Sequence, residues 1–90
     1  MYQIVFSKDA QRDLVLLQEK APNVLKKLRL LLLELQEHPR TGTGQVEQLR
    51  HYQEETWSRR LSKEHRLVYR IYDDIVEVLV LSTYGHYDKS

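Results

Sequence analysis

The sequence predicts an α+β domain of the order β-α-α-β-β-β, in which two N-terminal helices pack on one face of a small, mainly antiparallel sheet. Apolar residues recur at helical spacing between residues 10 and 35, and they alternate with period two from residue 56 onward. A chain of 90 residues can enclose one hydrophobic core, so residues 1–90 are predicted to form a single domain. The hydrophobic fraction of 41% excludes an intrinsically disordered chain.

The first three elements are predicted before residue 38. Residues 2–6 form a strand, and Ser7 offers a side-chain oxygen as the N-cap of the first helix. Pro22 suits the first position of a second helix, which runs to about Glu37. Its four consecutive leucines, 30–33, give it more apolar surface than one sheet face covers. We favour burial of this run between the sheet and the first helix over a contact with another protein.

Strands are predicted for most of the remaining chain. A glycine-containing loop at 40–44 is followed by strand character from Val46. Residues 56–61 and 65–72 alternate with period two, and a short turn joins them. Asp73 and Asp74 mark another turn. The last strand, 75–81, is apolar at nearly every position, as is typical of a central strand.

Positive charge is concentrated in the middle of the chain. The net charge is only +1, but residues 38–70 hold seven Lys or Arg and four Glu, a net of +3. Alternation places Arg66 and Arg70 on the strand face opposite Tyr69, and a core does not accept unpaired arginines. That face is therefore predicted to be open, with Arg60 beside Arg66. This pattern suits phosphate binding, and a merely solvated strand face is the alternative.

Three segments together carry a resemblance to a known family. They are Trp57-Ser58-Arg59-Arg60, Glu64-His65-Arg66-Leu67-Val68-Tyr69 and Gly85-His86-Tyr87. Together they resemble the YoeB/Txe branch of the RelE toxin superfamily. The resemblance implies the RelE-like microbial RNase fold and the toxin of a type II toxin–antitoxin system. Such a toxin is a ribosome-dependent endoribonuclease that cleaves mRNA without a cofactor and leaves 2′,3′-cyclic phosphate and 5′-hydroxyl ends.

The resemblance also implies roles for individual residues. By position, Glu47 is the general base, Arg66 stabilises the transition state, and His86 and Tyr87 are the acid and the residue that stacks on the substrate. Contacts with RNA or the ribosome are implied for Arg50, His51, Arg59, Arg60 and Lys63. For Arg59, alternation leaves two orientations open: past Trp57 or toward a partner. The tail departs from the family, because Gly85 replaces an aromatic residue and 88–90 extend beyond the usual terminal tyrosine.

The partners implied by the resemblance are a YefM/Phd-type antitoxin, the 70S ribosome and mRNA. Operator DNA would be bound only through the antitoxin complex, and a homodimer is compatible with the leucine-rich second helix. No membrane span or secretory signal is expected, which favours the cytoplasm.

Other functional classes remain alternatives. A binding module that has lost catalysis would act only with its antitoxin, at operator DNA for example, and would use the same arginines. Gyrase-inhibiting toxins share the fold but lack the proposed catalytic set. A metal enzyme would need ligands from His38, His51, His65 and His86, whose spacing matches no usual ligand motif. The chain has no cysteine, which excludes thiolate chemistry and disulfides.

Overall fold

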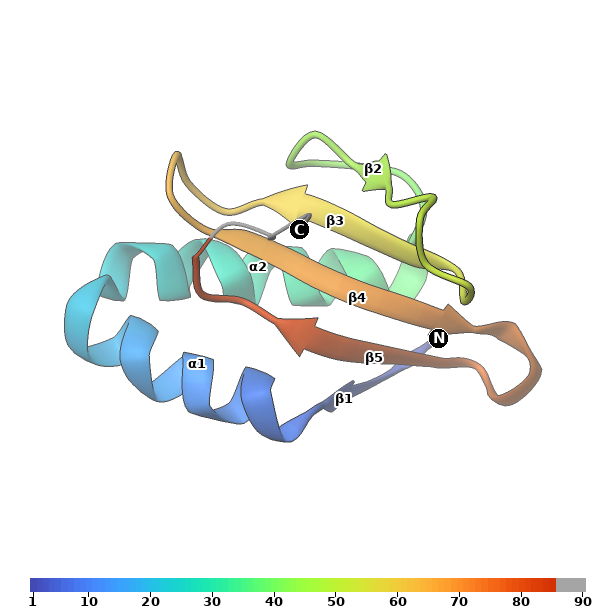
Figure 1. Cartoon of the computed structure of the whole chain (residues 1–90), viewed down its shortest axis with the longest axis horizontal. Helices are drawn as coiled ribbons and strands as arrows, with labels where there is room; N and C mark the ends of the chain where they lie inside the picture. Colours follow the sequence, from blue (N-terminus) through green and yellow to red (C-terminus); the bar gives the residue numbers. More distant parts are fainter. Residues whose placement is uncertain (86–90) are drawn as a thin grey trace.

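The computed structural model describes residues 1–85 as two helices on one face of a five-stranded sheet (Figure 1). The elements are β1 (Gln3–Phe6), α1 (Lys8–Lys20), α2 (Pro22–Glu37), β2 (Glu47–Gln48), β3 (Thr56–Arg60), β4 (Arg66–Tyr72), a 3₁₀ helix (Asp73–Ile75) and β5 (Glu77–Ser82). None of the helices in this part of the chain is long and apolar enough to cross a lipid bilayer.

The sheet has the strand order β1-β5-β4-β3-β2. β1 pairs with β5 in parallel, and all other neighbours are antiparallel. The predicted α+β class and mainly antiparallel sheet are therefore confirmed. β2 lies where strand character is predicted from Val46, and it pairs Glu47 with Ser58 and Gln48 with Trp57. It is one strand more than the predicted order β-α-α-β-β-β contains, because two residues are too few for alternation to define a separate strand.

Both helices begin where the sequence predicts, and their apolar stripes cover the sheet. The Ser7 hydroxyl accepts a hydrogen bond from Ala10 N at 3.0 Å, and Pro22 opens α2. The helices and the inner face of the sheet supply the fully buried core. Its largest members are Leu17, Leu28, Leu35, Leu67, Tyr69, Val78 and Val80. Tyr69 therefore lies in the core, on the strand face opposite Arg66 and Arg70, as alternation predicts.

The leucine run of α2 is only partly buried, so the prediction of burial is wrong for two of its members. Leu31 is 2% exposed, whereas Leu30 is 67% and Leu33 63% exposed. Consecutive residues of an α-helix are about 100° apart around its axis, so four in a row cannot all face one sheet. An exposed apolar strip therefore remains along the outer side of α2.

The last strand begins two residues later than predicted. Ile75 and Val76 are exposed, and Val76 adopts a left-handed conformation with φ of 51°. Ile75 ends the 3₁₀ helix between β4 and β5 and Val76 caps it, and apolar composition alone cannot distinguish such a turn from a strand. β5 then runs between β1 and β4, which confirms its predicted central place.

An ion-pair network links the loop after α2 to the turn between β4 and β5. Arg40 binds Glu55 through two hydrogen bonds of 2.7 and 2.9 Å, and it also donates to Asp73 at 2.7 Å. The Arg40 guanidinium holds the pKa of the Glu55 carboxyl below its usual range. The Tyr2 hydroxyl and Arg40 together lower the pKa of Asp73.

This network predicts a loss of stability in acid. Since the folded pKa values of Glu55 and Asp73 lie below their unfolded values, protons bind the unfolded chain first as the pH falls. The free energy of unfolding should therefore be steady near pH 7 and should decrease from about pH 5 downward. Urea unfolding from pH 7 to pH 3 measures this, and Glu55→Gln should weaken the dependence. The exposed Glu64→Gln serves as control; equal slopes for both variants would contradict the assignment.

Candidate functional site

The candidate site lies on the sheet face turned away from the helices, across β2, β3 and β4. Cross-strand pairing joins Arg60 to Arg66, Ser58 to Val68, and Glu47 to Ser58. Residues paired in this way project to the same side of a sheet, as do residues two apart on one strand. These five residues therefore share one surface, which we call the outer face.

Arg60 and Arg66 are direct neighbours on the outer face, which confirms the predicted pairing. Both side chains are partly exposed, and Arg60 Nε donates to Ser62 O at 3.3 Å. Within residues 1–85, neither arginine forms an ion pair with a carboxylate. Two adjacent positive charges without a counter-charge repel each other, so binding of an anion between them is favourable. A guanidinium pair suits a phosphate in particular, because each group can donate two parallel hydrogen bonds.

Glu47 lies on the same face, at the exposed edge strand β2. It is diagonal to Arg60, because its direct partner Ser58 is two residues earlier on β3. Two strand spacings and two residues separate it from Arg66, which puts their Cα atoms about 12 Å apart. Glutamate and arginine side chains can both extend into that interval. One phosphodiester could therefore meet the carboxylate on one side and the guanidinium groups on the other.

The middle of the outer face is not open, contrary to the prediction. Ser58 is 1% and Val68 2% exposed, so the accessible groups of this face are on its longer side chains. The Ser58 hydroxyl has no hydrogen-bond partner among the described residues. Arg70, expected to share the open face, is paired: it binds Glu54 at 3.0 Å and lies over the Tyr52 ring.

Arg59 does not belong to the outer face, so its predicted contact with RNA or a partner is wrong. Its side chain is fully buried on the helix side of β3. All three guanidinium nitrogens have protein acceptors there: the Tyr69 hydroxyl, the Glu34 carboxylate and three backbone carbonyls. Those carbonyls belong to His38, Thr41 and Thr43. Alternation along β3 turns Arg59 inward, and nothing remains free to bind a phosphate.

The buried Arg59 instead orders the loop that leads to Glu47. Glu34 accepts from Arg59 and also from Thr43, through the backbone N at 2.7 Å and the hydroxyl at 3.1 Å. The hydrogen bond from the Thr43 backbone, together with Arg59, lowers the pKa of Glu34. Gly42 adopts φ of 123°, and a Cβ there would clash with the Glu34 carboxylate. Glu34 and Arg59 therefore both bind the loop just before β2.

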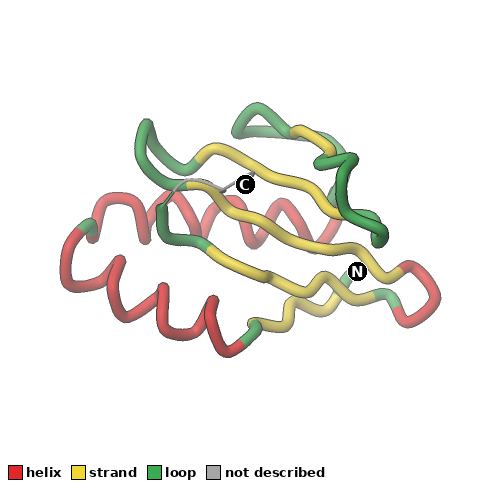
Figure 2. Tube along the Cα trace, viewed as in Figure 1, coloured by secondary structure: helices red, strands yellow, loops and turns green. Residues whose placement is uncertain are grey.

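The other predicted RNA contacts lie at the two ends of β3. Figure 2 shows the two connections at these ends as loops. Arg50 and His51 are exposed in the loop before β3, where His51 stacks on Tyr52 at 4.8 Å. Lys63 is exposed in the turn after β3. The side chains of Arg50, His51 and Lys63 thus all lie on the surface, near the two ends of β3.

The remaining catalytic candidates, His86 and Tyr87, lie outside the described residues. Gly85, which precedes them, accepts a hydrogen bond from Arg66 N at 3.0 Å. It also donates to His65 Nδ1 at 2.8 Å. Sequence reasoning treated His65 only as one metal candidate among four and missed this contact. The signal available was its place next to Arg66 in the Glu-His-Arg string.

No metal centre is formed by the described part of the chain. Within residues 1–85, no group of three or more His, Asp or Glu side chains could hold a metal ion. His38, His51 and His65, named as possible ligands, therefore form no such cluster.

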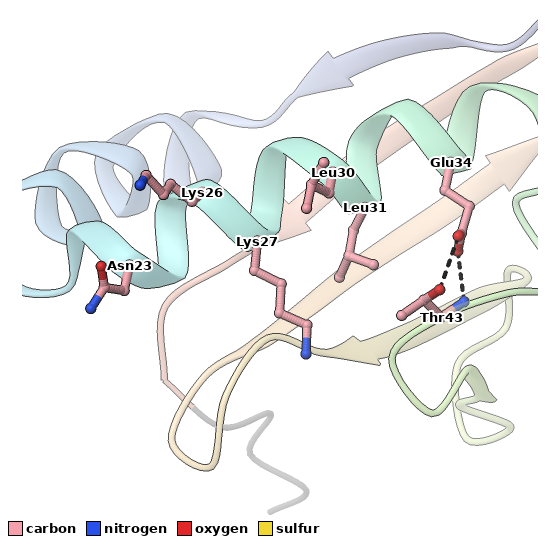
Figure 3. Close-up of a pocket in the computed structure, with 7 residues that line it drawn as sticks. All are labelled: Asn23, Lys26, Lys27, Leu30, Leu31, Glu34 and Thr43. Atoms are coloured by element: carbon pink, nitrogen blue, oxygen red, sulfur yellow. Dashed lines mark hydrogen bonds between the residues drawn. The ribbon is translucent and has the colours of Figure 1, made fainter.

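A second surface lies on α2, on the opposite side of the molecule's core from the outer face. A groove of about 440 Å³ runs beside the exposed Leu30 of α2 (Figure 3). It is lined by Asn23, Lys26, Lys27, Leu30, Leu31, Glu34 and Thr43. In Figure 3, Glu34 at one end points to Thr43, while Lys27 closer to the other end is directed toward the sheet. The groove is apolar with a basic end.

Comparison with known proteins gives consistent matches over nearly the whole chain. A family model described as a YoeB-like toxin of bacterial type II toxin–antitoxin systems matches residues 6–87. Toxin YoeB of Escherichia coli K12 is 33% identical over 84 residues, covering 93% of this chain and 98% of that toxin. The structure of a Staphylococcus aureus YoeB dimer is 31% identical with a TM-score of 0.84, covering 96% of this chain and 98% of that one. A heterotetrameric YoeB–YefM complex from the same organism gives 31% identity and a TM-score of 0.80, covering 97% and 99%.

Proposed function

The chain belongs to the family of YoeB-like toxins of bacterial type II toxin–antitoxin systems, and from this membership we propose that it is a ribosome-dependent endoribonuclease that cleaves mRNA in the ribosomal A site. One observation carries the proposal beyond family membership. The two neighbouring arginines, Arg60 and Arg66, which form no ion pair within residues 1–85, share the outer face with Glu47 at a separation that fits one phosphodiester. The arrangement suits phosphate chemistry with a carboxylate base.

The proposed reaction needs only side chains of the protein. Glu47 takes the proton of the ribose 2′-hydroxyl, whose oxygen then attacks phosphorus. Arg66 stabilises the additional negative charge on the phosphoryl oxygens as the new bond forms. The bond from phosphorus to the 5′-oxygen breaks, and His86 gives its proton to that leaving oxygen. The products are a 2′,3′-cyclic phosphate and a 5′-hydroxyl, and Tyr87 would stack on a base of the substrate.

The other polar side chains predicted to contact RNA would bind the substrate complex. Arg60 lies beside Arg66 and would hold a phosphate, while Arg50, His51 and Lys63 would contact mRNA or ribosomal RNA on either side of the cut. Since these contacts are mainly electrostatic, ribosome binding should weaken as the salt concentration rises.

Partners follow from family membership as proposals. A YefM/Phd-type antitoxin would neutralise the toxin, as the composition of the S. aureus YoeB–YefM complex suggests, and operator DNA would be bound only through that complex. A homodimer has a precedent in the S. aureus YoeB dimer. Action on translating ribosomes places the protein in the cytoplasm.

The direct test is cleavage of mRNA on purified ribosomes. We would incubate the antitoxin-free protein with programmed ribosomes and map the cut ends by primer extension, with free RNA in EDTA as a parallel reaction. Ribosome-dependent cuts at the A-site codon that end in cyclic phosphate would support the proposal. A folded sample that cuts nothing would instead favour the alternative of a catalytically impaired binding module that acts with its antitoxin.

Replacing Glu47 with glutamine should slow cleavage by a factor on the order of a hundred, because the amide has the same shape but cannot take a proton. The single-turnover rate on programmed ribosomes measures the effect. Glu64→Gln, an exposed glutamate in the turn after β3, is the control and should cleave at the wild-type rate. Unchanged cleavage by Glu47→Gln would remove Glu47 from the role of base.

A further inference from the structure

After β5 the chain leaves the sheet, and its next three backbone N–H groups are bound by side chains. Asp13 Oδ2, from α1, accepts from Thr83 N at 2.9 Å and from Tyr84 N at 3.3 Å. His65 Nδ1, at the start of β4, accepts from Gly85 N at 2.8 Å. This segment is therefore fixed by two side chains that are distant in sequence.

His65 is itself held in one orientation. Its side chain is largely buried, with the ring against Tyr84 at 4.7 Å between centroids. Its backbone closes the turn after β3, since its N donates to the Ser62 hydroxyl and its carbonyl accepts from Leu61 and Ser62. Because Nδ1 accepts, the neutral ring carries its proton on Nε2.

Arg66 completes the attachment of Gly85. The Arg66 backbone N donates to Gly85 O at 3.0 Å, so two consecutive residues of the chain bind the N–H and the carbonyl of one glycine. Gly85 has φ of 81°, a conformation that favours glycine. We call His65 Nδ1 and Arg66 N together the Gly85 clamp.

We propose that His65 is a positioning residue for cleavage, which acts by fixing Gly85 next to Arg66. His86 is joined to Gly85 by one peptide bond, so fixing Gly85 fixes the point from which the chain continues to His86 and Tyr87. Without the clamp, the general acid would follow a segment whose last attachments are the hydrogen bonds to Asp13 and the packing of Tyr84 against the core. This inference rests on the proposed function, because His65 affects cleavage only through the residues that follow Gly85.

Two variants of His65 separate the hydrogen bond from the ring. His65→Phe keeps an aromatic ring against Tyr84 but removes the acceptor. His65→Asn loses the ring but places an amide oxygen near the position of Nδ1, where it can accept from Gly85 N. If the clamp is what matters, the asparagine variant should resemble wild type and the phenylalanine variant should not. Far-ultraviolet circular dichroism would confirm that both variants are folded.

The first readout is hydrogen exchange of the Gly85 amide, followed by NMR in the free protein. Wild type and His65→Asn should protect this amide, and His65→Phe should lose the protection. The second readout is single-turnover cleavage on programmed ribosomes. His65→Phe should lower the maximal rate on the order of tenfold or more, with little change in the ribosome concentration that gives half the maximal rate, because misplacement of a reacting group affects the chemical step.

Each outcome decides the proposal. Equal protection of Gly85 in all three proteins, or full cleavage by a His65→Phe variant that has lost protection, would overturn it. An asparagine variant that protects the Gly85 amide but cleaves as slowly as the phenylalanine variant would also overturn it, because an acceptor for Gly85 N would then not be sufficient. If wild type cuts no mRNA, the proposed function fails; Gly85 exchange in the two variants then still decides whether the clamp exists.

Discussion

Replacing Arg66 with alanine is expected to slow mRNA cleavage on programmed ribosomes by a factor on the order of a hundred to a thousand. Its guanidinium lies on the outer face beside Arg60, without a carboxylate partner in the described chain, and so is free to meet the phosphate as negative charge develops. Removing such a donor raises the transition state more than the ground state, so the maximal rate should fall more than affinity for the ribosome. Single-turnover cleavage over a range of ribosome concentrations separates these two quantities.

The Arg66→Ala variant should remain folded, because the hydrogen bond from residue 66 to Gly85 uses the backbone N. Arg66→Lys should retain part of the activity, since lysine keeps the charge but loses the two-pronged geometry. Arg12→Ala is a matched control, because Arg12 is an exposed arginine of α1 on the other side of the sheet. Full cleavage by a folded Arg66→Ala variant would show that Arg66 does not stabilise the transition state.

Local signals in the sequence were sufficient for most of the fold. Ser7 and Pro22 fix the helix starts through interactions with their immediate neighbours, and period-two alternation locates β3 and β4. The errors occurred where tertiary structure decides. Leu30 and Ile75 are exposed apolar residues within apolar runs. Only the packing of the whole chain shows which residues of such a run are buried.

In the candidate site, too, local sequence patterns predicted some contacts and missed those that depend on tertiary structure. Alternation was sufficient to place Arg60 beside Arg66, because both belong to strands joined by a short turn. It could not reveal the partner of Arg59, since Glu34 is 25 residues earlier in the chain. Nor could it reveal that His65 binds Gly85, 20 residues later. Contacts between distant segments depend on the folded topology, which cannot be inferred from the local pattern of a single sequence.

The two neighbouring strands use consecutive residues for different tasks. In β3, Arg59 points inward and orders the loop before Glu47, while Arg60 points to the outer face. At the start of β4, His65 holds Gly85, while Arg66 lies on the outer face. One member of each pair therefore fixes a segment that carries a proposed catalytic residue, and the other faces the substrate. Since the period of a strand is two, adjacent residues can divide these tasks without competing for space.

Comparison of Arg59→Ala with Arg60→Ala tests this division directly. Arg59→Ala removes the partner of Glu34 and leaves the Tyr69 hydroxyl and three loop carbonyls without their donor. The free energy of unfolding should decrease by about 3–5 kcal/mol, a large share of the total for a domain of this size. Arg60→Ala should change it by no more than about 0.5 kcal/mol, because the side chain is partly exposed and forms no ion pair within residues 1–85. Urea unfolding followed by circular dichroism measures both.

The same two variants should rank in the opposite order for phosphate binding. Arg60→Ala should weaken the interaction with programmed ribosomes while the protein stays folded, since it removes one of the two neighbouring arginines of the outer face. Arg59→Lys covers the case in which Arg59→Ala does not fold: lysine keeps the charge next to Glu34 but cannot supply all five hydrogen bonds, so its stability should lie between those of alanine and wild type. If Arg59→Ala were as stable as Arg60→Ala, the buried guanidinium would not be what orders the loop before β2. The position of Glu47 would then depend on β2–β3 pairing alone.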